Sequence, residues 1–267
     1  MIISKTPFRI SLIGGGTDFP SYYKKKAGLV IGGTIDKYCY VTARFLPKVF
    51  DYKHRIVWSK NEVVNNNNEI FHPTVRSVFN YLKIDKGLEI HYQGDLQKNS
   101  GLGTSSSFCV GLINSIKSLY NKNISTKNLA QTAIHIEQNI MKENSGSQDQ
   151  IWAAYGGFNT IDFKKNNKFK VKKLTLTNSK INKLNNNLFL VYTGIHKYSH
   201  IVEKDKLINF NKNIDLLDQI YLLAKEFKST IVKNSNIDFI GDILNEYWFL
   251  KKKLSNKVSN SKVDEIY

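Results

Sequence analysis

The sequence predicts an α+β fold in two domains, because strand patterns and helix patterns are mixed along the chain. Residues 88–92 alternate apolar and polar side chains, as a half-buried strand does. Residues 109–119 and 129–141 place apolar side chains at the spacing of an amphipathic helix. A chain of 267 residues is long enough for two modest domains, and we expect them at residues 1–182 and 183–267.

The first elements along the chain are strands. Residues 2–13 have a strand pattern that Pro7 is expected to interrupt, and residues 31–45 contain a run rich in β-branched and aromatic side chains. Pro73 then opens a helix, since proline is favoured in the first helical turn. The strand and the two helices described above follow it.

The second half of the chain continues the mixture. Residues 158–163 begin a strand, and the lysines and asparagines of residues 164–168 form a solvated turn. The apolar run at residues 188–194 predicts a buried strand that opens the second domain. Two helices are expected after it, over residues 214–227 and 239–254.

The stretch at residues 99–107, between a strand and a helix, is rich in glycine and hydroxyl side chains. The first N–H groups of a helix lack internal partners and carry partial positive charge, so this position suits an anion. Gly101 and Gly103 let the backbone approach a phosphate closely, and the serines can cap the helix or ligate magnesium. On this stretch alone, a phosphate loop and a plain Ser/Thr-rich helix cap are equally good interpretations.

Two further glycine-containing turns each present an aspartate. Residues 14–17 are followed by Asp18, after a strand that carries Arg9, and residues 144–148 lead into Asp149. A single turn of this kind needs no function. Three such turns in one chain suggest a phosphate-binding site with a carboxylate for proton transfer.

Together these motifs resemble the GHMP kinase superfamily, the galacto-, homoserine-, mevalonate- and phosphomevalonate kinases. The first motif of that family, a Pro-x-Arg strand that ends in glycine and Thr-Asp, is matched by residues 7–18. Its Gly-Leu-Gly-Ser-Ser loop is matched by residues 101–106, and its Ser-Gly-x-x-Asp turn by residues 145–149. A glutamate about three helical turns before that aspartate is matched by Glu137.

The resemblance implies the fold of the family, with an N-terminal β-α-β nucleotide-binding domain and a ferredoxin-like α+β C-terminal domain. It also implies ATP and Mg²⁺ as cofactors, and transfer of the γ-phosphoryl group to a sugar hydroxyl. Ser105 and Glu137 would hold the magnesium ion. The ATP phosphates would be bound by the loop residues Gly101, Leu102, Gly103, Thr104, Ser105, Ser106 and Ser107.

The resemblance assigns the reacting groups as well. Asp149 would take or orient the proton of the acceptor hydroxyl, and Arg9 would stabilise negative charge beside it. The sugar hydroxyls would be bound by the turn residues Gly15, Gly16, Thr17 and Asp18. From the residues alone, simpler roles stay open: the two aspartates as turn caps, Glu137 on a solvated helix face, and Arg9 in a surface ion pair.

Within the superfamily, residues 14–18, 148–150 and 155–158 are most similar to the heptose 7-phosphate kinase branch. That branch implies D-glycero-D-manno-heptose 7-phosphate as the acceptor and the 1,7-bisphosphate as the product, in nucleotide-activated heptose synthesis for cell-surface polysaccharide. A fucokinase- or galactokinase-like enzyme and a non-catalytic nucleotide- or sugar-binding protein are the alternatives. The third glycine-rich motif of the superfamily does not occur before residue 267, so we expect a C-terminally truncated kinase of low activity.

The composition favours a soluble cytoplasmic enzyme. The net charge of +17 comes from lysines spread among Asn and Ile, which share A/T-rich codons, so genome composition explains it better than nucleic-acid binding. No run reaches the roughly 20 apolar residues of a membrane span, and Cys39 and Cys109 are expected to be buried free thiols in a reducing compartment. The expected partners are ATP and a sugar phosphate, with no nucleic acid and no membrane, and a homodimer stays open.

Other ATP-using classes are excluded by their motifs. The chain has no P-loop, no His-Arg-Asp or Asp-Phe-Gly pair of a protein kinase, and no third glycine at dinucleotide-fold spacing. His196 and His200 have a metal-like spacing, but no acidic ligand adjoins them. A surface loop or a substrate contact is therefore the better interpretation of these two histidines.

Overall fold

The computed structural model of the chain describes residues 1–97, 100–194, 205, 210, 212–233 and 238–267. The chain forms two compact units, each built from separate stretches of sequence. The first unit comprises Met1–Ile10, Thr34–Ser145 and Asp149–Gly156. The second unit comprises Ser11–Gly33, Gly146–Gln148 and Gly157–Tyr267. The strands at residues 2–13 and 28–45 each contribute to both units, and the domain boundary after residue 182 stays a prediction.

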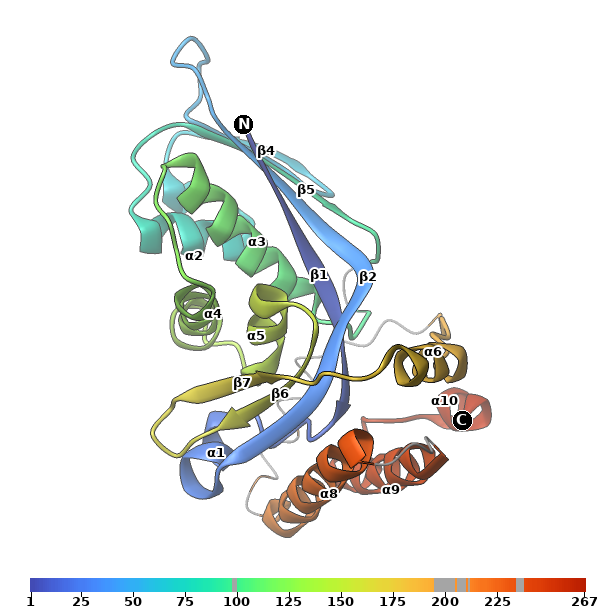
Figure 1. Cartoon of the computed structure of the whole chain (residues 1–267). Coiled ribbons are helices and arrows are strands. Elements are labelled where there is room, and N and C mark those ends of the chain that lie inside the picture. The colour runs from blue at the N-terminus through green and yellow to red at the C-terminus, as the bar shows by residue number, and fades with distance from the viewer. Residues whose placement is uncertain (98–99, 195–204, 206–209, 211, 234–237) are drawn as a thin grey trace. The chain divides into compact units, whose positions relative to one another are not determined.

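The first unit consists of strands with helices packed against them (Figure 1). Its strands are β1 (Ile2–Ile13), β2 (Gly28–Phe45), β3 (His54–Val57), β4 (Asn61–Val64) and β5 (Leu88–Gly94). They are hydrogen-bonded in the order β4-β3-β5-β2, and β1 pairs with β2. The helices are η1 (Asn67–Glu69), α2 (Pro73–Leu82), α3 (Thr104–Leu119), α4 (Thr126–Ile134), the π-helical turn η2 (His135–Ile140) and α5 (Gln148–Tyr155).

Alternation along the strands explains how this sheet is covered. Val41 and Ala43 of β2 are buried together with Leu88 and Ile90 of β5, since side chains two apart on a strand share one face. Apolar side chains of α2, α3 and α4 join them in a single hydrophobic core. The strand and the amphipathic helices predicted for this region are therefore confirmed, with one refinement: the last helix changes from α to π geometry at His135.

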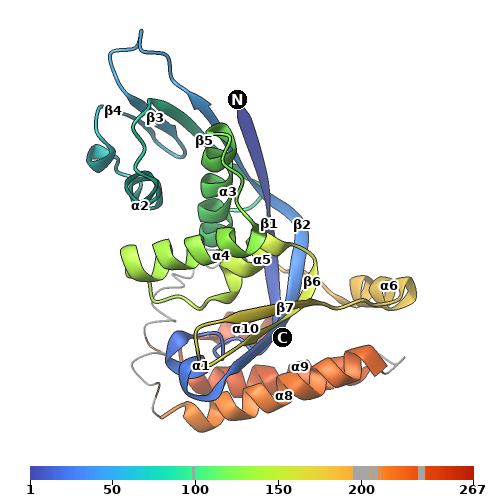
Figure 2. The same cartoon turned by 60° about the vertical axis from the view of Figure 1, so that its left-hand side comes forward.

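The second unit joins the first part of β2 to a hairpin and a pair of long helices. Residues 28–33 of β2 pair antiparallel with β6 (Phe158–Phe163), which pairs with β7 (Phe169–Lys173). Its helices are α1 (Pro20–Lys26), α6 (Asn178–Asn187), α8 (Ile214–Lys233), α9 (Asp238–Leu254) and α10 (Ser261–Ile266). Helices α8 and α9 lie side by side (Figure 2), and their Leu223 and Tyr247 join Leu29 and Ile31 in a second hydrophobic core.

Two details of the strand prediction are wrong. Residues 188–194 are irregular instead of forming a buried strand, and Phe189 and Tyr192 are 85 % and 78 % exposed. A strand needs a partner for its backbone N–H and C=O groups, and no described strand pairs with this stretch. Strand β1 continues through Pro7, because β2 is its only neighbour among the described strands and proline is tolerated in an edge strand.

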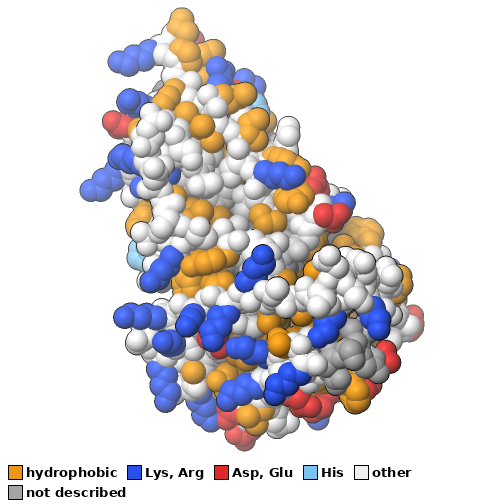
Figure 3. Space-filling model, in the orientation of Figure 1, with side chains coloured by type: hydrophobic (Ala, Val, Ile, Leu, Met, Phe, Trp, Pro, Cys, Tyr) orange, Lys and Arg blue, Asp and Glu red, His pale blue; other side chains and the backbone are white. Residues whose placement is uncertain are grey.

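The surface of the second unit carries much of the positive charge. On the face in Figure 3, basic side chains gather over α1 and β7. Helix α1 has Lys24, Lys25 and Lys26 in its last turn, and β7 contains Lys170, Lys172 and Lys173. Among the residues that the structure describes, no helix combines the length and the apolar character needed to cross a membrane. Cys39 and Cys109 are buried and unbridged, as the sequence predicts.

Candidate active site

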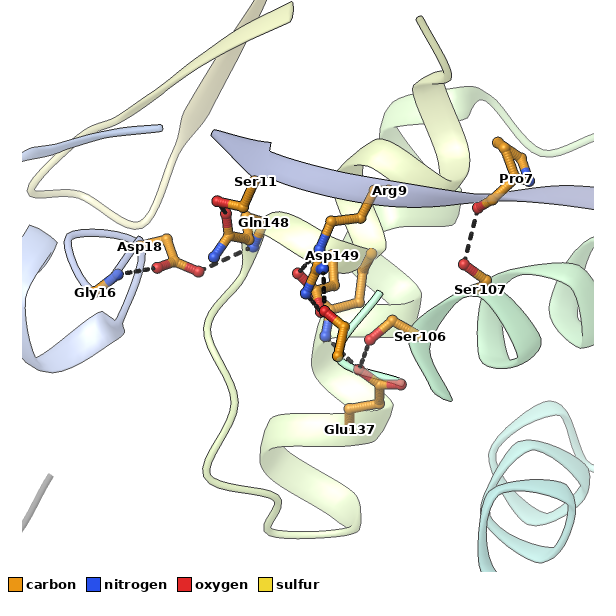
Figure 4. Close-up of polar contacts among 12 residues, drawn as sticks. Pro7, Arg9, Ser11, Gly16, Asp18, Ser106, Ser107, Glu137, Gln148 and Asp149 are labelled. Carbon is orange, nitrogen blue, oxygen red and sulfur yellow. Dashed lines mark hydrogen bonds and ion pairs between the residues drawn. The ribbon is translucent and has the colours of Figure 1, made fainter. Parts of the chain in front are cut away.

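The centre of the candidate site in the first unit is a forked ion pair between Arg9 of β1 and Asp149 of α5. The Arg9 Nε atom donates to Asp149 Oδ1 at 2.7 Å, and Arg9 Nη2 donates to Asp149 Oδ2 at 2.5 Å (Figure 4). Their side chains are 13 % and 24 % exposed. Two parallel charge-assisted bonds in a partly buried place fix both the position and the plane of the carboxylate. A surface ion pair, the simpler role open to Arg9, does not describe this geometry.

The same arginine holds the glycine-rich loop before α3. Arg9 Nη1 donates to the carbonyl oxygen of Gly101 at 2.7 Å, and the Arg9 backbone N–H donates to the carbonyl oxygen of Leu102 at 3.1 Å. Ser107 Oγ adds a bond to the carbonyl oxygen of Pro7 at 2.9 Å. The loop is thus fastened to β1 on both sides of its second glycine, Gly103.

The loop leads into a helix whose first turn is open to an anion. Gly103 is the N-cap of α3, with φ +74, and no side chain caps the helix. The first backbone bond of the helix runs from the Ser107 N–H to the Gly103 carbonyl at 2.9 Å. The N–H groups of Thr104, Ser105 and Ser106 therefore precede the internal ladder, in the place where helices bind phosphate. This geometry favours the phosphate loop over the plain cap.

A buried carboxyl lies on the other side of the loop. Glu137, on the π-helical turn η2, is 1 % exposed. Its Oε2 atom accepts a bond from Ser106 Oγ at 2.8 Å and a second bond from Gln150 Nε2. Burial raises the pKa of Glu137 to about 8, and the nearby charge of Glu143 adds to the rise, whereas the two hydrogen bonds oppose it. The solvated helix face that remained open for Glu137 is wrong.

The family implies a magnesium ion, and the residues present fit one. The Oε1 atom of Glu137 is buried and has no hydrogen-bond partner within the described part of the chain. Beside it the hydroxyl of Ser106 supplies a second hard oxygen, and Mg²⁺ is usually bound by one or two protein oxygens together with substrate phosphates. Ser106 contacts Glu137, whereas the sequence assigned Ser105 to the metal; Ser105 is exposed on the first turn of α3.

The turn predicted to bind sugar hydroxyls is stabilised by hydrogen bonds within the second unit. Asp18 is fully buried; its Oδ1 accepts the Gly16 N–H at 2.9 Å and its Oδ2 accepts the Gln148 N–H at 3.4 Å. The Thr17 side chain is buried too, and its Oγ1 lies 2.8 Å from the Gly14 carbonyl oxygen. This is the turn-capping geometry that the residues alone left open for Asp18. Contacts of Gly15, Gly16, Thr17 and Asp18 with a sugar stay a prediction.

Sequence reasoning missed two side chains beside the predicted residues. Gln150, next to Asp149, is fully buried against Glu137, and Ser11 Oγ donates to Gln148 Oε1 at 2.7 Å within the second unit. Both lie inside stretches that the sequence matched to the family, residues 148–150 and 7–18, but the sequence assigned no role to either. His196 and His200 lie outside the described residues, as do residues 98–99 at the entry of the loop.

Comparison with known proteins identifies this arrangement. Residues 69–157, from η1 to just beyond α5, match the GHMP kinases N terminal domain. Over this stretch the chain is similar to the GHMP kinases. The stretch contains the phosphate loop, Glu137 and Asp149, and the match confirms the resemblance predicted from the sequence.

Individual relatives agree with the family. The chain is 28 % identical over 279 residues to D-glycero-alpha-D-manno-heptose 7-phosphate kinase of Campylobacter jejuni. That alignment covers 100 % of this chain and 81 % of the relative. It is 26 % identical to the bifunctional fucokinase/GDP-fucose pyrophosphorylase of Arabidopsis thaliana, over 98 % of this chain and 27 % of that one. The crystal structure of a D-glycero-D-manno-heptose 1-phosphate kinase from Bacteriodes thetaiotaomicron matches with a TM-score of 0.80 at 23 % identity, over 95 % and 80 % of the chains. The last similarity confirms the predicted GHMP kinase fold.

The two loop glycines provide a matched test of the Arg9–Asp149 contact. Both have positive φ, so a side chain at either position has the left-handed backbone cost of roughly 1–2 kcal/mol. A Cβ atom at Gly103 would lie 3.2 Å from Arg9 Cγ and 3.3 Å from Asp149 Oδ2, whereas at Gly101 it would meet nothing within 4 Å. We expect Gly103→Val to abolish ATP binding and the same change at the other glycine, Gly101→Val, to weaken it less, measured by calorimetry. Equal affinities in the two variants would contradict this.

The buried carboxyl of Glu137 makes stability depend on pH. In the unfolded chain the group ionises near its ordinary pKa of 4.5, whereas in the folded chain its pKa is about 8. The stability that protonated Glu137 contributes is therefore fully present below pH 4.5 and is lost as the pH rises through 8, because the unfolded state releases the proton first. Urea unfolding without Mg²⁺ measures this: the free energy of unfolding should fall less steeply with pH over this range in Glu137→Gln than in the wild type. The exposed-site control Glu246→Gln should keep the wild-type slope; an unchanged slope in Glu137→Gln would contradict the expectation.

Proposed function

We propose that this protein is a GHMP kinase, which transfers the γ-phosphoryl group of ATP to a hydroxyl group of a heptose phosphate. The observation that supports it best is the double anchoring of Arg9, to Asp149 through two bonds and to the phosphate loop through two more. This single side chain couples the group that would meet the acceptor hydroxyl to the loop that would meet the ATP phosphates.

The proposed binding of ATP uses the loop and the helix behind it. The N–H groups at the start of α3 and the positive end of its dipole would bind the phosphate oxygens, with Gly101 and Gly103 keeping the backbone bare for close approach. Leu102 is partly buried against the core and would hold the loop between the two glycines. Thr104, Ser106 and Ser107 are buried, which leaves Ser105 as the hydroxyl most accessible to a phosphate.

In the proposed reaction the acceptor oxygen forms a bond to the γ-phosphorus, the bond to the β,γ-bridging oxygen breaks, and ADP leaves. The proton of the acceptor hydroxyl passes to a carboxylate oxygen of Asp149. Arg9 fixes the plane of that carboxylate and places positive charge beside the transferred group. Positioning and charge neutralisation are the main tasks of the protein in phosphoryl transfer.

Mg²⁺ is the proposed metal cofactor. Glu137 would hold it together with a serine hydroxyl of the loop, Ser106 by contact or Ser105 by the family motif. When bound, the ion would neutralise negative charge on the ATP phosphates.

The proposed acceptor class rests on the relatives. Two of them are named as kinases of heptose phosphates, one acting on the 7-phosphate and one named for the 1-phosphate. We propose the 7-phosphate, because that relative is matched over the whole of this chain. The cytoplasm is the proposed compartment, since it supplies ATP and suits the buried free thiols Cys39 and Cys109.

A substrate panel tests the proposal. ADP release is measured with D-glycero-D-manno-heptose 7-phosphate, the 1-phosphate, L-fucose, D-galactose and no acceptor, with product identified by mass spectrometry. The proposal expects turnover with the 7-phosphate well above the other arms. A preference for fucose would favour a function like that of the fucokinase relative, and ATP binding without turnover on any sugar would favour a binding protein.

Asp149→Asn tests the proton acceptor. The amide keeps the shape of the side chain but cannot take a proton, so kcat measured at saturating ATP should fall by about 10²–10⁴-fold. The matched control is Asp162→Asn, which removes a half-exposed carboxylate paired with Lys228 and should leave kcat unchanged. A loss of roughly tenfold or less in Asp149→Asn would remove this residue from the role.

A further inference from the structure

Gln150 joins the two halves of the candidate site. It follows Asp149 on α5, and it is fully buried. Its Nε2 atom donates to Glu137 Oε2, the same oxygen that accepts the Ser106 hydroxyl. The phosphate loop is thus held from one side by Arg9 and Asp149 and from the other by Ser106, Glu137 and Gln150.

The hydrogen bonds at Glu137 are distributed unevenly between its two oxygens. Oε2 accepts two donors, whereas Oε1 is buried without a partner among the described residues. The carboxylate cannot rotate about its terminal bond without losing the bond from Ser106 or the bond from Gln150. Its unpaired oxygen is therefore presented in one fixed direction.

We infer that Gln150 is a positioning residue, which holds the carboxylate of Glu137 so that Oε1 is available to the magnesium ion of Mg·ATP. The inference rests on the proposed function, since it concerns the metal of that reaction. Nothing in the family motifs assigns a role to this glutamine. Three separate observations support such a role: Gln150 is buried, it donates to Glu137 Oε2, and Glu137 Oε1 has no partner among the described residues.

The chemistry of the side chain explains why an amide suits this place. A neutral N–H donor orients a carboxylate without cancelling its charge, so the charge of Glu137 stays available to a cation. A lysine or arginine there would form a buried ion pair and compete with the metal. A glutamate would place a second carboxylate against the first.

The test measures how much Mg²⁺ strengthens ATP binding. Calorimetry gives the Kd for ATP in EDTA and in excess Mg²⁺, and the ratio of the two is compared among variants. Gln150→Leu removes the donor at similar volume, and Gln150→Met repeats the test with an unbranched chain in case the leucine variant does not fold. The matched control is Gln138→Leu, which removes a glutamine on η2 whose Nε2 bonds the Ser145 carbonyl oxygen at 2.9 Å.

We expect the ratio to fall by about tenfold or more in both Gln150 variants, with the Kd in EDTA within about threefold of wild type and the ratio unchanged in Gln138→Leu. A double-mutant cycle shows whether Gln150 acts through Glu137: in a Glu137→Gln background, Gln150→Leu should cause no further loss. An undiminished ratio in the Gln150 variants, or a further loss in that background, overturns the inference. If the wild type itself shows no effect of Mg²⁺, the proposed metal fails first, and the two failures are distinguishable.

Discussion

The candidate site depends on one ion pair, the fork between Arg9 and Asp149. An arginine in a partly buried fork has little freedom. Here its Nη1 atom also donates to the carbonyl oxygen of Gly101, and its backbone N–H donates to the carbonyl oxygen of Leu102. The guanidinium group of Arg9 thereby ties three elements together: its own strand β1, the glycine-rich loop before α3, and helix α5. Arg9 cannot be replaced by lysine on these terms, because an ammonium group has no fork with which to make these bonds at once.

Close packing around the pair explains the glycine at the N-cap of α3. At Gly103 a Cβ atom would press on both members of the pair, and the left-handed φ already disfavours other residues. The glycine therefore serves two needs, the turn into the helix and the room for the ion pair. The helix terminus is left without a side-chain cap as a result, since a residue with a capping side chain there would take a strained positive φ and crowd the ion pair.

Burying Glu137 costs free energy, and packing alone does not explain why a carboxyl group stands at this position. A fully buried carboxyl group destabilises the folded state as it ionises, and an uncharged residue would avoid this. Its neighbours Ser106 and Gln150 satisfy only one of its oxygens. A group that is costly to bury and half satisfied is typical of a site that awaits a ligand.

The sequence was informative where residue type and spacing determine chemistry. The loop glycines, Arg9, Glu137 and Asp149 were all identified by motif, and the structure brings these residues of the first unit together. Gln150 was not identified, because only the turn of α5 and the π-helical turn place it against Glu137. The contact of Ser106 with Glu137 was not predicted either, because neighbours on a helix point in different directions; Ser105 as a magnesium ligand stays a prediction. Residues 188–194 have the composition of a strand, but pairing depends on distant residues that local pattern does not include.

A double-mutant cycle on the ligand-free protein measures the coupling in the Arg9–Asp149 pair directly. Arg9→Gln, Asp149→Asn and the double variant are unfolded in urea, and their free energies of unfolding are compared with that of wild type. If the fork holds the loop as described, either single substitution breaks the same bonds between Arg9 and Asp149. The double variant should then be more stable than the sum predicts by at least about 1 kcal/mol. Free energies that add within roughly 0.3–0.5 kcal/mol would contradict a site organised by this pair.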